Sequence, residues 1–152
     1  MGTIRWMRDF ITTEIVAWEY IDRTLKARHG ISLAFFEVLD ALADAPQHAM
    51  RIGDIARALR ITVGAASKLI DRIEATQLVA RQPDSHDRRA SIVVLCHTGL
   101  EQVTAARTTY ASEVQRILDT AFTPAEQQQF HMLTRRMYNA FAGVGVHMHA
   151  GE

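Results

Sequence analysis

The sequence predicts a mainly α fold with one small β-hairpin, and three observations carry this prediction. Apolar residues recur at three- and four-residue intervals through most of the chain, as they do on the buried faces of helices. Two short β-rich runs, 78–81 and 91–95, are separated by a turn-forming segment. The 152 residues are 48% hydrophobic and 22% charged, which is ordinary for a folded chain. We therefore expect one domain spanning residues 1–152.

A capped helix is predicted to begin at Val63, because the Thr62 hydroxyl can accept from the free backbone N–H groups of the first turn. Its buried face is formed by apolar residues spaced three and four apart: Ala66, Leu69, Ile70 and Ile73. Its opposite face carries small or polar residues and then a cation: Gly64, Ala65, Ser67, Lys68 and Arg72. A helix that is slim over its N-terminal half can enter a DNA major groove and reach base edges.

The two β-rich runs predict a hairpin, and residues 83–89 form a turn whose far end is basic. Upstream, a short helix at 52–59 and a tight break at 60–61 precede the capped helix, which is helix-turn-helix spacing. Met50-Arg51 is expected to add a brief edge strand. Two neighbouring arginines alone would favour a hairpin with merely solvated charges. The order of helix, turn, capped helix, strand, basic turn and strand predicts a winged helix-turn-helix.

A long helix is predicted over Ile4 to His29, before the winged helix-turn-helix. Its apolar stripe is thickened toward a second face: Ile4, Trp6, Met7, Phe10, Ile11, Ile15, Ala17, Trp18, Tyr20, Ile21 and Leu25. A terminal helix is rarely wrapped on all sides, so we expect a dimer contact here rather than a helix deep in its own core. Gly30 is expected to end this helix, and Ser32 to cap the next.

The C-terminal third is predicted to contain two more helices. The first spans Thr98 to Asp119, and the second follows a capping box, Thr123 to Glu126, and runs to about Phe141. Residues 143–152 are expected to form a looser tail. The domain is thereby divided into dimerisation helices at 1–30 and 120–145, a winged helix-turn-helix lobe at 31–97, and a connecting helix at 98–119.

The formal net charge is zero, but the charge is unevenly distributed. Residues 51–91 contain eight Arg or Lys against five Asp or Glu, so positive charge is concentrated around the predicted helix-turn-helix and hairpin. A basic surface at this place favours binding to nucleic acid. Because the excess is modest, we expect site-specific binding with only moderate non-specific affinity.

The sequence predicts neither a catalytic site nor a metal site. His147 and His149 are the one close histidine pair, and no Cys or carboxylate cluster accompanies them, so we expect no metal and no cofactor. The single cysteine, Cys96, suits a reducing cytoplasm and stands at a helix-capping position. No nucleophile-like arrangement and no phosphate-cradling glycine loop is present, so we expect no enzyme. The absence of a bilayer-length apolar run and of a signal peptide predicts a cytoplasmic protein without a membrane segment.

The sequence resembles the multiple-antibiotic-resistance regulator (MarR) family over most of its length. The matching positions are Leu69, Asp71 to Glu74, Leu78, Val79, Arg81, Pro83, Asp87 to Arg89 and Leu95 to Gly99, with upstream segments 32–39 and 52–56. The Asp-x-Arg wing motif, Asp87 and Arg89, is fairly specific. The chain departs from the family pattern at Gln77, where the family has Gly, and at Cys96, where it has Thr. We therefore expect Gln77 to adopt the left-handed conformation that glycine favours at a helix end.

The resemblance implies a homodimeric, cytoplasmic transcriptional regulator, expected to be a repressor, whose partner is double-stranded DNA with a pseudo-palindromic operator. The implied DNA-binding residues are Thr62, Gly64, Ala65, Ser67, Lys68 and Arg72 of the recognition helix, and Asp87, Arg88 and Arg89 of the wing. Arg89 is expected to enter the minor groove with Asp87 orienting it. Arg72 is expected to brace the wing or contact phosphate.

The resemblance also implies relief of repression by a small aromatic or amphipathic effector. Its pocket is expected where the dimer helices meet the DNA-binding lobe, with Trp18, Phe36 and Tyr110 in its lining; ordinary packing is the alternative role of these three side chains. A different class of function stays open. The chain could be a helical dimer that acts through protein partners, and a mobility-shift assay discriminates between the two.

Overall fold

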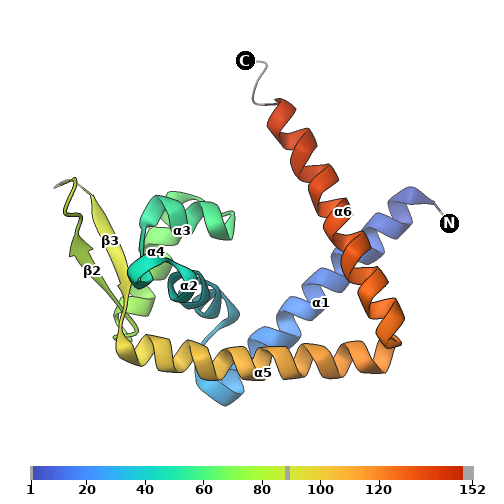
Figure 1. Cartoon of the computed structure of the whole chain (residues 1–152), viewed down its shortest axis with the longest axis horizontal. Helices are drawn as coiled ribbons and strands as arrows, with labels where there is room; N and C mark the ends of the chain where they lie inside the picture. The colour runs from blue at the N-terminus through green and yellow to red at the C-terminus, as the bar shows by residue number, and fades with distance from the viewer. Residues whose placement is uncertain (1, 88–89, 149–152) are drawn as a thin grey trace. The chain divides into compact units, whose positions relative to one another are not determined.

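The computed structural model describes residues 2–87 and 90–148, and residues 145–148 by their backbone alone. Along the chain (Figure 1) lie α1 (Thr3–His29), α2 (Leu33–Asp44), the 3-10 helix η1 (Pro46–His48), β1 (Ala49–Arg51), α3 (Ile52–Leu59), α4 (Val63–Glu74), β2 (Val79–Pro83), β3 (Ser91–Leu95), α5 (His97–Ala121) and α6 (Pro124–Met148). The predicted mainly α fold with a small hairpin is confirmed. Among the helices described, none is long and apolar enough to cross a membrane.

The chain forms two compact units, Met1–Ala111 and Ser112–Glu152, and α5 begins in the first and ends in the second. The first unit contains α1 to α4, the sheet and the first part of α5. The predicted division into dimerisation helices, a lobe and a connecting helix stays a prediction.

The core of the first unit gathers around α2. Leu39 and Leu42 of this helix are fully buried, together with side chains from α1, α3, α4, β3 and α5: Leu25, Ile55, Ile70, Ile73, Val93 and Val103. As predicted, Ser32 caps α2 by accepting from the Phe35 N–H at 3.1 Å. Gly30 ends α1 with φ +68°, a left-handed conformation that glycine adopts without strain. Local signals in the sequence therefore set the turn that brings α1 onto α2.

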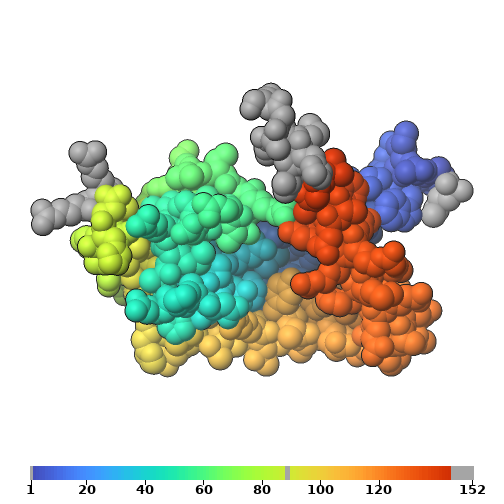
Figure 2. Space-filling model, turned by 45° about the horizontal axis from the view of Figure 1, so that its top comes forward, coloured from blue at the N-terminus to red at the C-terminus, as the bar shows by residue number. Residues whose placement is uncertain are grey.

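The sheet has three antiparallel strands in the order β1-β3-β2. β3 is central because Val93 pairs with Met50 of β1 on one side and with Arg81 of β2 on the other. The predicted edge strand is confirmed as β1, and β2 with β3 forms the hairpin of the winged helix-turn-helix. Figure 2 shows this hairpin, in yellow-green, at the edge of the surface formed by the helix-turn-helix.

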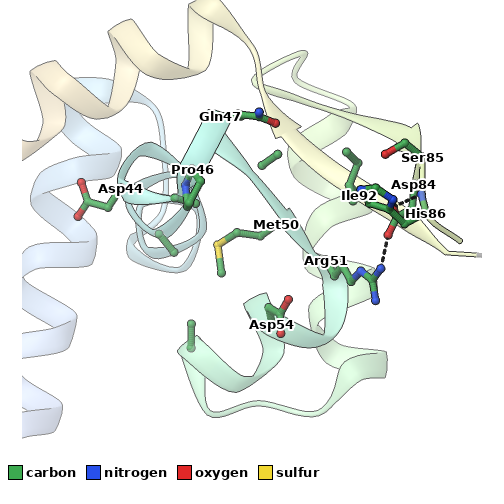
Figure 3. Close-up of a pocket in the computed structure, with 14 residues that line it drawn as sticks. Asp44, Pro46, Gln47, Met50, Arg51, Asp54, Asp84, Ser85, His86 and Ile92 are labelled. Carbon is green, nitrogen blue, oxygen red and sulfur yellow. Dashed lines mark hydrogen bonds and ion pairs between the residues drawn. The ribbon is translucent and has the colours of Figure 1, made fainter.

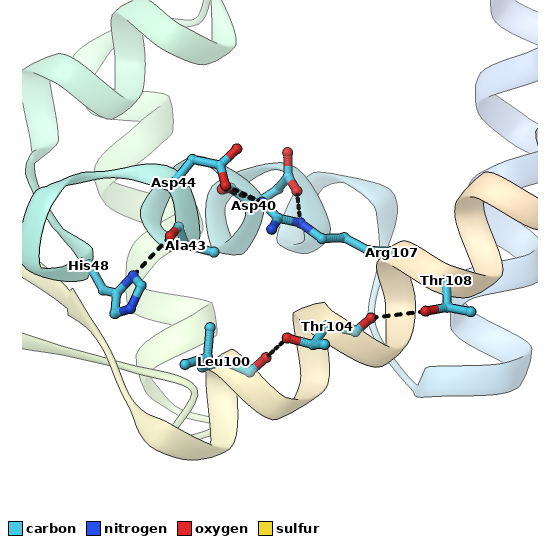
Figure 4. A network of polar contacts seen from close by, with 8 residues as sticks. All are labelled: Asp40, Ala43, Asp44, His48, Leu100, Thr104, Arg107 and Thr108. Carbon is cyan, nitrogen blue, oxygen red and sulfur yellow. Dashed lines mark hydrogen bonds and ion pairs between the residues drawn. The ribbon is translucent and has the colours of Figure 1, made fainter.

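Arg107 fastens the first part of α5 to α2. Its Nε lies 2.6 Å from Asp40 Oδ1 and its Nη2 lies 2.8 Å from Asp44 Oδ1, as Figure 4 shows. Both carboxylates raise the pKa of Arg107, that of Asp44 first. In the same view His48 Nδ1 lies 2.9 Å from the Ala43 carbonyl oxygen, which ties η1 back to the end of α2.

The second unit contains the predicted capping box. The Thr123 N–H donates to Glu126 Oε2 at 2.8 Å, and the Glu126 N–H donates to Thr123 Oγ1 at 3.4 Å. The end predicted for α6, near Phe141, is wrong, because the helix continues to Met148. A glycine inside a helix lowers the stability of the helix by only about 1 kcal/mol. Gly143 alone is therefore not enough to end α6.

Candidate nucleic-acid interface

Helix α4 begins as the sequence predicts. The Ala65 N–H donates to Thr62 Oγ1 at 3.1 Å, and Ala66, Ile70 and Ile73 are buried. Leu69 was predicted to be buried with them and is only half-buried. The helix is thus anchored by its cap and one apolar face, which leaves its opposite face for a partner.

The outer face of α4 is slim and open. Thr62, Gly64, Ala65, Lys68 and Arg72 are exposed, whereas Ser67 is half-buried. A Cβ added at Gly64 would have no atom within 4 Å, so nothing in the protein demands a glycine there. Val63, the first residue of the helix, is also exposed, at 58%. Apolar side chains in this place can contact thymine methyl groups, and the sequence analysis missed this residue.

Arg81 of β2 ties the hairpin to α4. Its Nη1 binds the Asp71 carboxylate and lies 3.1 Å from Glu74 Oε2. Its Nη2 lies 3.3 Å from both Ser67 Oγ and the Ser67 carbonyl oxygen. The Arg81 backbone N–H donates to Glu74 Oε1 at 3.1 Å. The hydrogen bond that Arg81 donates to the Asp71 carboxylate is the main cause that raises the pKa of Arg81, which therefore stays charged.

Arg72 was expected to brace the wing or to contact phosphate, and in the structure its neighbour is Phe35 of α2. Its guanidinium carbon lies 5.4 Å from the centroid of the Phe35 ring, a cation–π distance. The side chain that connects α4 to the wing is Arg81 instead. Arg72 is exposed on α4, and its phosphate contact stays a prediction.

Asp84 organises the start of the wing turn. Its buried carboxylate accepts from the His86 backbone N–H at 2.9 Å and pairs with Arg51 Nη2 of β1 at 2.6 Å. The Asp84 N–H donates to the Ala90 carbonyl oxygen at 3.1 Å, which closes the turn across the hairpin. The His86 N–H, followed by Arg51, holds the pKa of Asp84 below its ordinary value. The wing base is therefore tied to β1 by an ion pair between the buried Asp84 carboxylate and the half-exposed Arg51 guanidinium.

The predicted wing tip is only partly within the described structure. Asp87 is exposed, and its carbonyl oxygen accepts from the Ala90 N–H at 3.0 Å. Arg88 and Arg89, the two basic residues predicted for the wing, lie outside the described residues.

A pocket of about 750 Å³ lies between the end of α2, η1, β1, α3 and the wing base (Figure 3). Met50 points into it, and the Arg51–Asp84 ion pair stands at its edge. Gln47, also in the lining, has φ +57° and is followed by His48 with φ +53°. Within the part of the chain that the structure describes, no group of three or more His, Cys, Asp or Glu could hold a metal ion.

The three side chains predicted for an effector pocket lie elsewhere in the first unit. Phe36 of α2 is buried and stacks on Tyr110 of α5 with ring centroids 5.2 Å apart. Burial, with the Glu37 and Asp40 carboxylates nearby, raises the pKa of Tyr110. Trp18 is exposed on α1. The geometry of the first two is that of a packed aromatic pair, and their role in a pocket stays a prediction.

Sequence reasoning did not identify Arg81, Asp71, Glu74, Arg51 and Asp84 as parts of the interface. Each is a charged residue whose partner is distant in the sequence or on another element, so periodicity and capping signals carry no information about the pairing. The one available signal was the place of Arg81 and Asp71 among the positions that resemble the MarR family.

The sequence model of the MarR family matches residues 29–90, which span the start of α2 to the wing. No curated protein matches this chain in sequence. Among solved structures, the DNA complex of Sco3205, a MarR family transcriptional regulator from Streptomyces coelicolor, is 22% identical. It has a TM-score of 0.80, with 90% of this chain and 85% of that chain covered.

AbsC, a MarR family transcriptional regulator from the same organism, is 21% identical with a TM-score of 0.81, covering 94% of this chain and 97% of its own. MepR from S. aureus, in complex with DNA, is 24% identical with a TM-score of 0.75, covering 92% and 99%. These likenesses establish the fold over most of the chain. Residues 29–90 of this protein match the MarR family model, and the chain has the fold of MarR family transcriptional regulators.

Proposed function

We propose that this protein is a sequence-specific DNA-binding transcriptional regulator that acts as a homodimeric repressor. The observation that carries the proposal is the geometry of α4: a capped helix with a slim exposed face is held by charged hydrogen bonds to the adjoining hairpin. Helix and hairpin therefore form one unit that can meet a major groove and the neighbouring minor groove together. Two of the similar structures, those of Sco3205 and MepR, are complexes with DNA.

In this proposal each recognition helix enters the major groove of one half-site of a pseudo-palindromic operator. Its contacts come from Thr62, Gly64, Ala65, Ser67, Lys68 and Arg72. The wing carries Arg88 and Arg89 and reaches the minor groove through Arg89, which Asp87 orients. In this proposal Ser67 Oγ accepts from Arg81 Nη2 at 3.3 Å, and its O–H remains able to donate to the DNA.

Exposed apolar side chains on both long terminal helices support a homodimer. On α1 these are Ile4, Trp6, Ile11, Ile15, Val16 and Trp18, and on α6 they are Phe130, Met132, Leu133, Tyr138, Phe141 and Val144. Large apolar surfaces of this kind mark interaction sites. We propose that segments 1–30 and 120–145 form the dimer interface and that 31–97 is the DNA-binding lobe.

Point substitutions test this interface better than deletion of the first helix. Removal of residues 1–27 would also remove Ile21 and Leu25, which are buried in the core of the first unit. Ile15 is 48% exposed, so Ile15→Asp is expected to leave the fold intact and shift the protein to monomers in analytical ultracentrifugation. The two half-sites of an operator lie about 34–36 Å apart, so one DNA-binding lobe cannot contact both. A monomeric variant should therefore also lose most of its specific affinity for DNA. A dimer that persists with Ile15→Asp and with Phe141→Asp places the interface elsewhere.

The test of DNA binding is a mobility-shift titration on the DNA that flanks the protein's own gene, repeated at several salt concentrations. Arg89→Ala is expected to weaken binding and to lower the slope of log affinity against log salt by about one unit per lost phosphate-level contact. Lys68→Ala should relax sequence preference more than it changes the salt slope if Lys68 reads bases. If Arg89→Ala keeps the affinity and the salt slope of the wild type, the wing is not part of the DNA interface.

The alternative is a helical dimer that acts through protein partners, which predicts no specific shift of any duplex. MarR family members are transcription regulators and not enzymes, and we extend this to the present chain. We place its action in the cytoplasm, together with the DNA that it is proposed to bind.

We also propose relief of repression by a small aromatic or amphipathic effector, with Trp18, Phe36 and Tyr110 as its contacts. A ligand can weaken DNA binding only as far as its own affinity differs between the two protein shapes, typically about 5–150-fold. A panel of such compounds should be titrated while thermal shift and operator affinity are recorded together. Compounds that stabilise the protein without altering operator affinity would show that the effector site is not regulatory.

A further inference from the structure

Arg81 holds the wing to the recognition helix with both its backbone and its side chain. Glu74 accepts from the Arg81 backbone N–H through Oε1 and from its guanidinium through Oε2, each at 3.1 Å. Asp71 and Ser67, further back along α4, accept from the same guanidinium. One arginine therefore contacts residues over two turns of α4, from Ser67 to Glu74.

The position of Arg81 in the sheet carries this attachment to the whole hairpin. It lies in the middle of β2 and pairs with Val93 of the central strand β3. Five residue pairs join β2 to β3, so the two strands move together. A tie at Arg81 fixes the direction of the hairpin relative to α4.

The charge of Arg81 is already matched within the protein. Asp71 and Glu74 both form ion pairs with it, and its side chain is only 26% exposed. A guanidinium in this situation is a poor phosphate contact, because binding DNA would require breaking two ion pairs. Arg81 therefore serves recognition by holding the DNA-contacting residues of the wing and of α4 in position.

We propose that Arg81 is a positioning residue for DNA recognition, which clamps the wing to α4 so that both meet their grooves at once; this rests on the proposed function. Without the clamp, the segment 75–78 would be the direct link between helix and wing, and the pairing with β1 and the Arg51–Asp84 ion pair would hold the hairpin from its other side. The free protein would then have to lose that freedom on binding, at a cost in affinity. The clamp should therefore govern specific affinity and the wing footprint, and it should affect the salt slope only through the contact that the wing makes.

The test uses a substitution that changes the charge of the protein. Simple electrostatics and the clamp predict opposite changes in its affinity for DNA. Asp71→Asn removes one negative charge from the DNA-binding lobe, so simple electrostatics predicts tighter binding to DNA. The clamp predicts weaker binding, because Arg81 loses a charged hydrogen bond. Asp54→Asn is the matched control: Asp54 lies on α3, pairs with Arg57 of the same helix at 3.0 Å, and makes the same charge change at a residue that does not bind Arg81. Arg81→Lys is the second variant, since it keeps the charge and loses the planar fork.

All variants are measured against a duplex selected in vitro with the wild-type protein. We expect Asp71→Asn and Arg81→Lys to bind at least about tenfold more weakly, as for loss of a charged hydrogen bond, with a salt slope lowered by no more than about the one unit expected for Arg89→Ala. Hydroxyl-radical protection should be lost in the flanking minor grooves and kept at the centre of each half-site. Asp54→Asn should bind as wild type or more tightly. If Asp71→Asn behaves as Asp54→Asn, or if Arg81→Lys keeps wild-type affinity and footprint, the proposal is overturned.

Amide exchange without DNA separates failure of the clamp from failure of the proposed function. The Arg81 N–H is bound to Glu74, so its exchange rate reports directly on attachment of the hairpin to α4. Asp71→Asn and Arg81→Lys should speed this exchange at unchanged global stability, while Asp54→Asn should not. If the wild type selects no duplex, the proposed function fails, and faster exchange still supports the clamp. Unchanged exchange in both variants overturns the clamp whatever the DNA result.

Discussion

Gly99, in the first turn of α5, lies so close to the Leu78 carbonyl oxygen that no side chain fits between them. A Cβ at residue 99 would overlap this oxygen and would stand 2.7 Å from Leu95 Cδ1. The same carbonyl accepts from the Cys96 N–H at 3.0 Å, so it is fixed in place. Helix α5 therefore starts directly against the chain that leaves α4, and glycine is required by this approach.

Gly99→Ala is expected to destabilise the fold by about 1–3 kcal/mol or more, because the overlap is with backbone that cannot move aside freely. The free energy of unfolding by urea measures this. Gly53→Ala on α3 is the matched control, since its Cβ would have no atom within 4 Å. The control should be stabilised by up to about 1 kcal/mol through helix propensity. Equal effects of the two substitutions would contradict the close packing at Gly99.

Gly64→Ala separates the needs of the fold from those of the DNA. Its added methyl group meets open space in the free protein, so stability should rise slightly, as at Gly53. If α4 enters a major groove with this face, the methyl group meets base edges or phosphates, and specific affinity should fall although stability does not. The same titration with Gly53→Ala should show no loss. Wild-type affinity for Gly64→Ala would mean that Gly64 lies away from the DNA.

Gln77 adopts the left-handed conformation predicted from its place after the recognition helix, with φ +63°. A residue with a side chain is strained there by roughly 1–2 kcal/mol. Gln77→Gly is therefore expected to raise the melting temperature without loss of DNA binding. The Thr98 hydroxyl donates to the Gln77 carbonyl oxygen at 3.1 Å, a bond that the substitution keeps. A lower melting temperature would indicate that glycine's freedom in the unfolded chain outweighs the relief of strain.

Asp84 makes stability depend on pH in the acid range. Its pKa in the folded protein is lowered, first by the His86 N–H and then by Arg51. Its contribution is therefore fully present above the unfolded pKa, about 3.9, and is lost as pH falls through the lower folded value. Asp84→Asn should be less stable than wild type at neutral pH, and the difference should shrink below about pH 4. Urea titrations from pH 3 to pH 7 measure it, and a constant difference would show that the carboxylate charge is not what matters.

Much of the fold was readable from local patterns. The Thr62 and Ser32 caps, the Gly30 helix end, the Thr123–Glu126 capping box and the left-handed Gln77 all stand where they were predicted. These features depend on a residue and its neighbours within a few positions, so the sequence specifies them directly. The exposed face of α4 follows in the same way from helical spacing. The end of α6 was misplaced because glycine was given more weight than its small cost warrants.

The tertiary structure alone decided how these elements are joined. Arg81 contacts residues seven to fourteen positions away, and Arg51 meets Asp84 across the sheet. Gly99 is needed because α5 packs on Leu78, and Arg107 finds Asp40 and Asp44 far back in the chain. Pairings of this kind depend on which elements lie beside one another, and a charged residue carries no local sign of its partner. The sequence by itself thus determined the recognition helix and the hairpin, while the fold decided that Arg81 would lock them together.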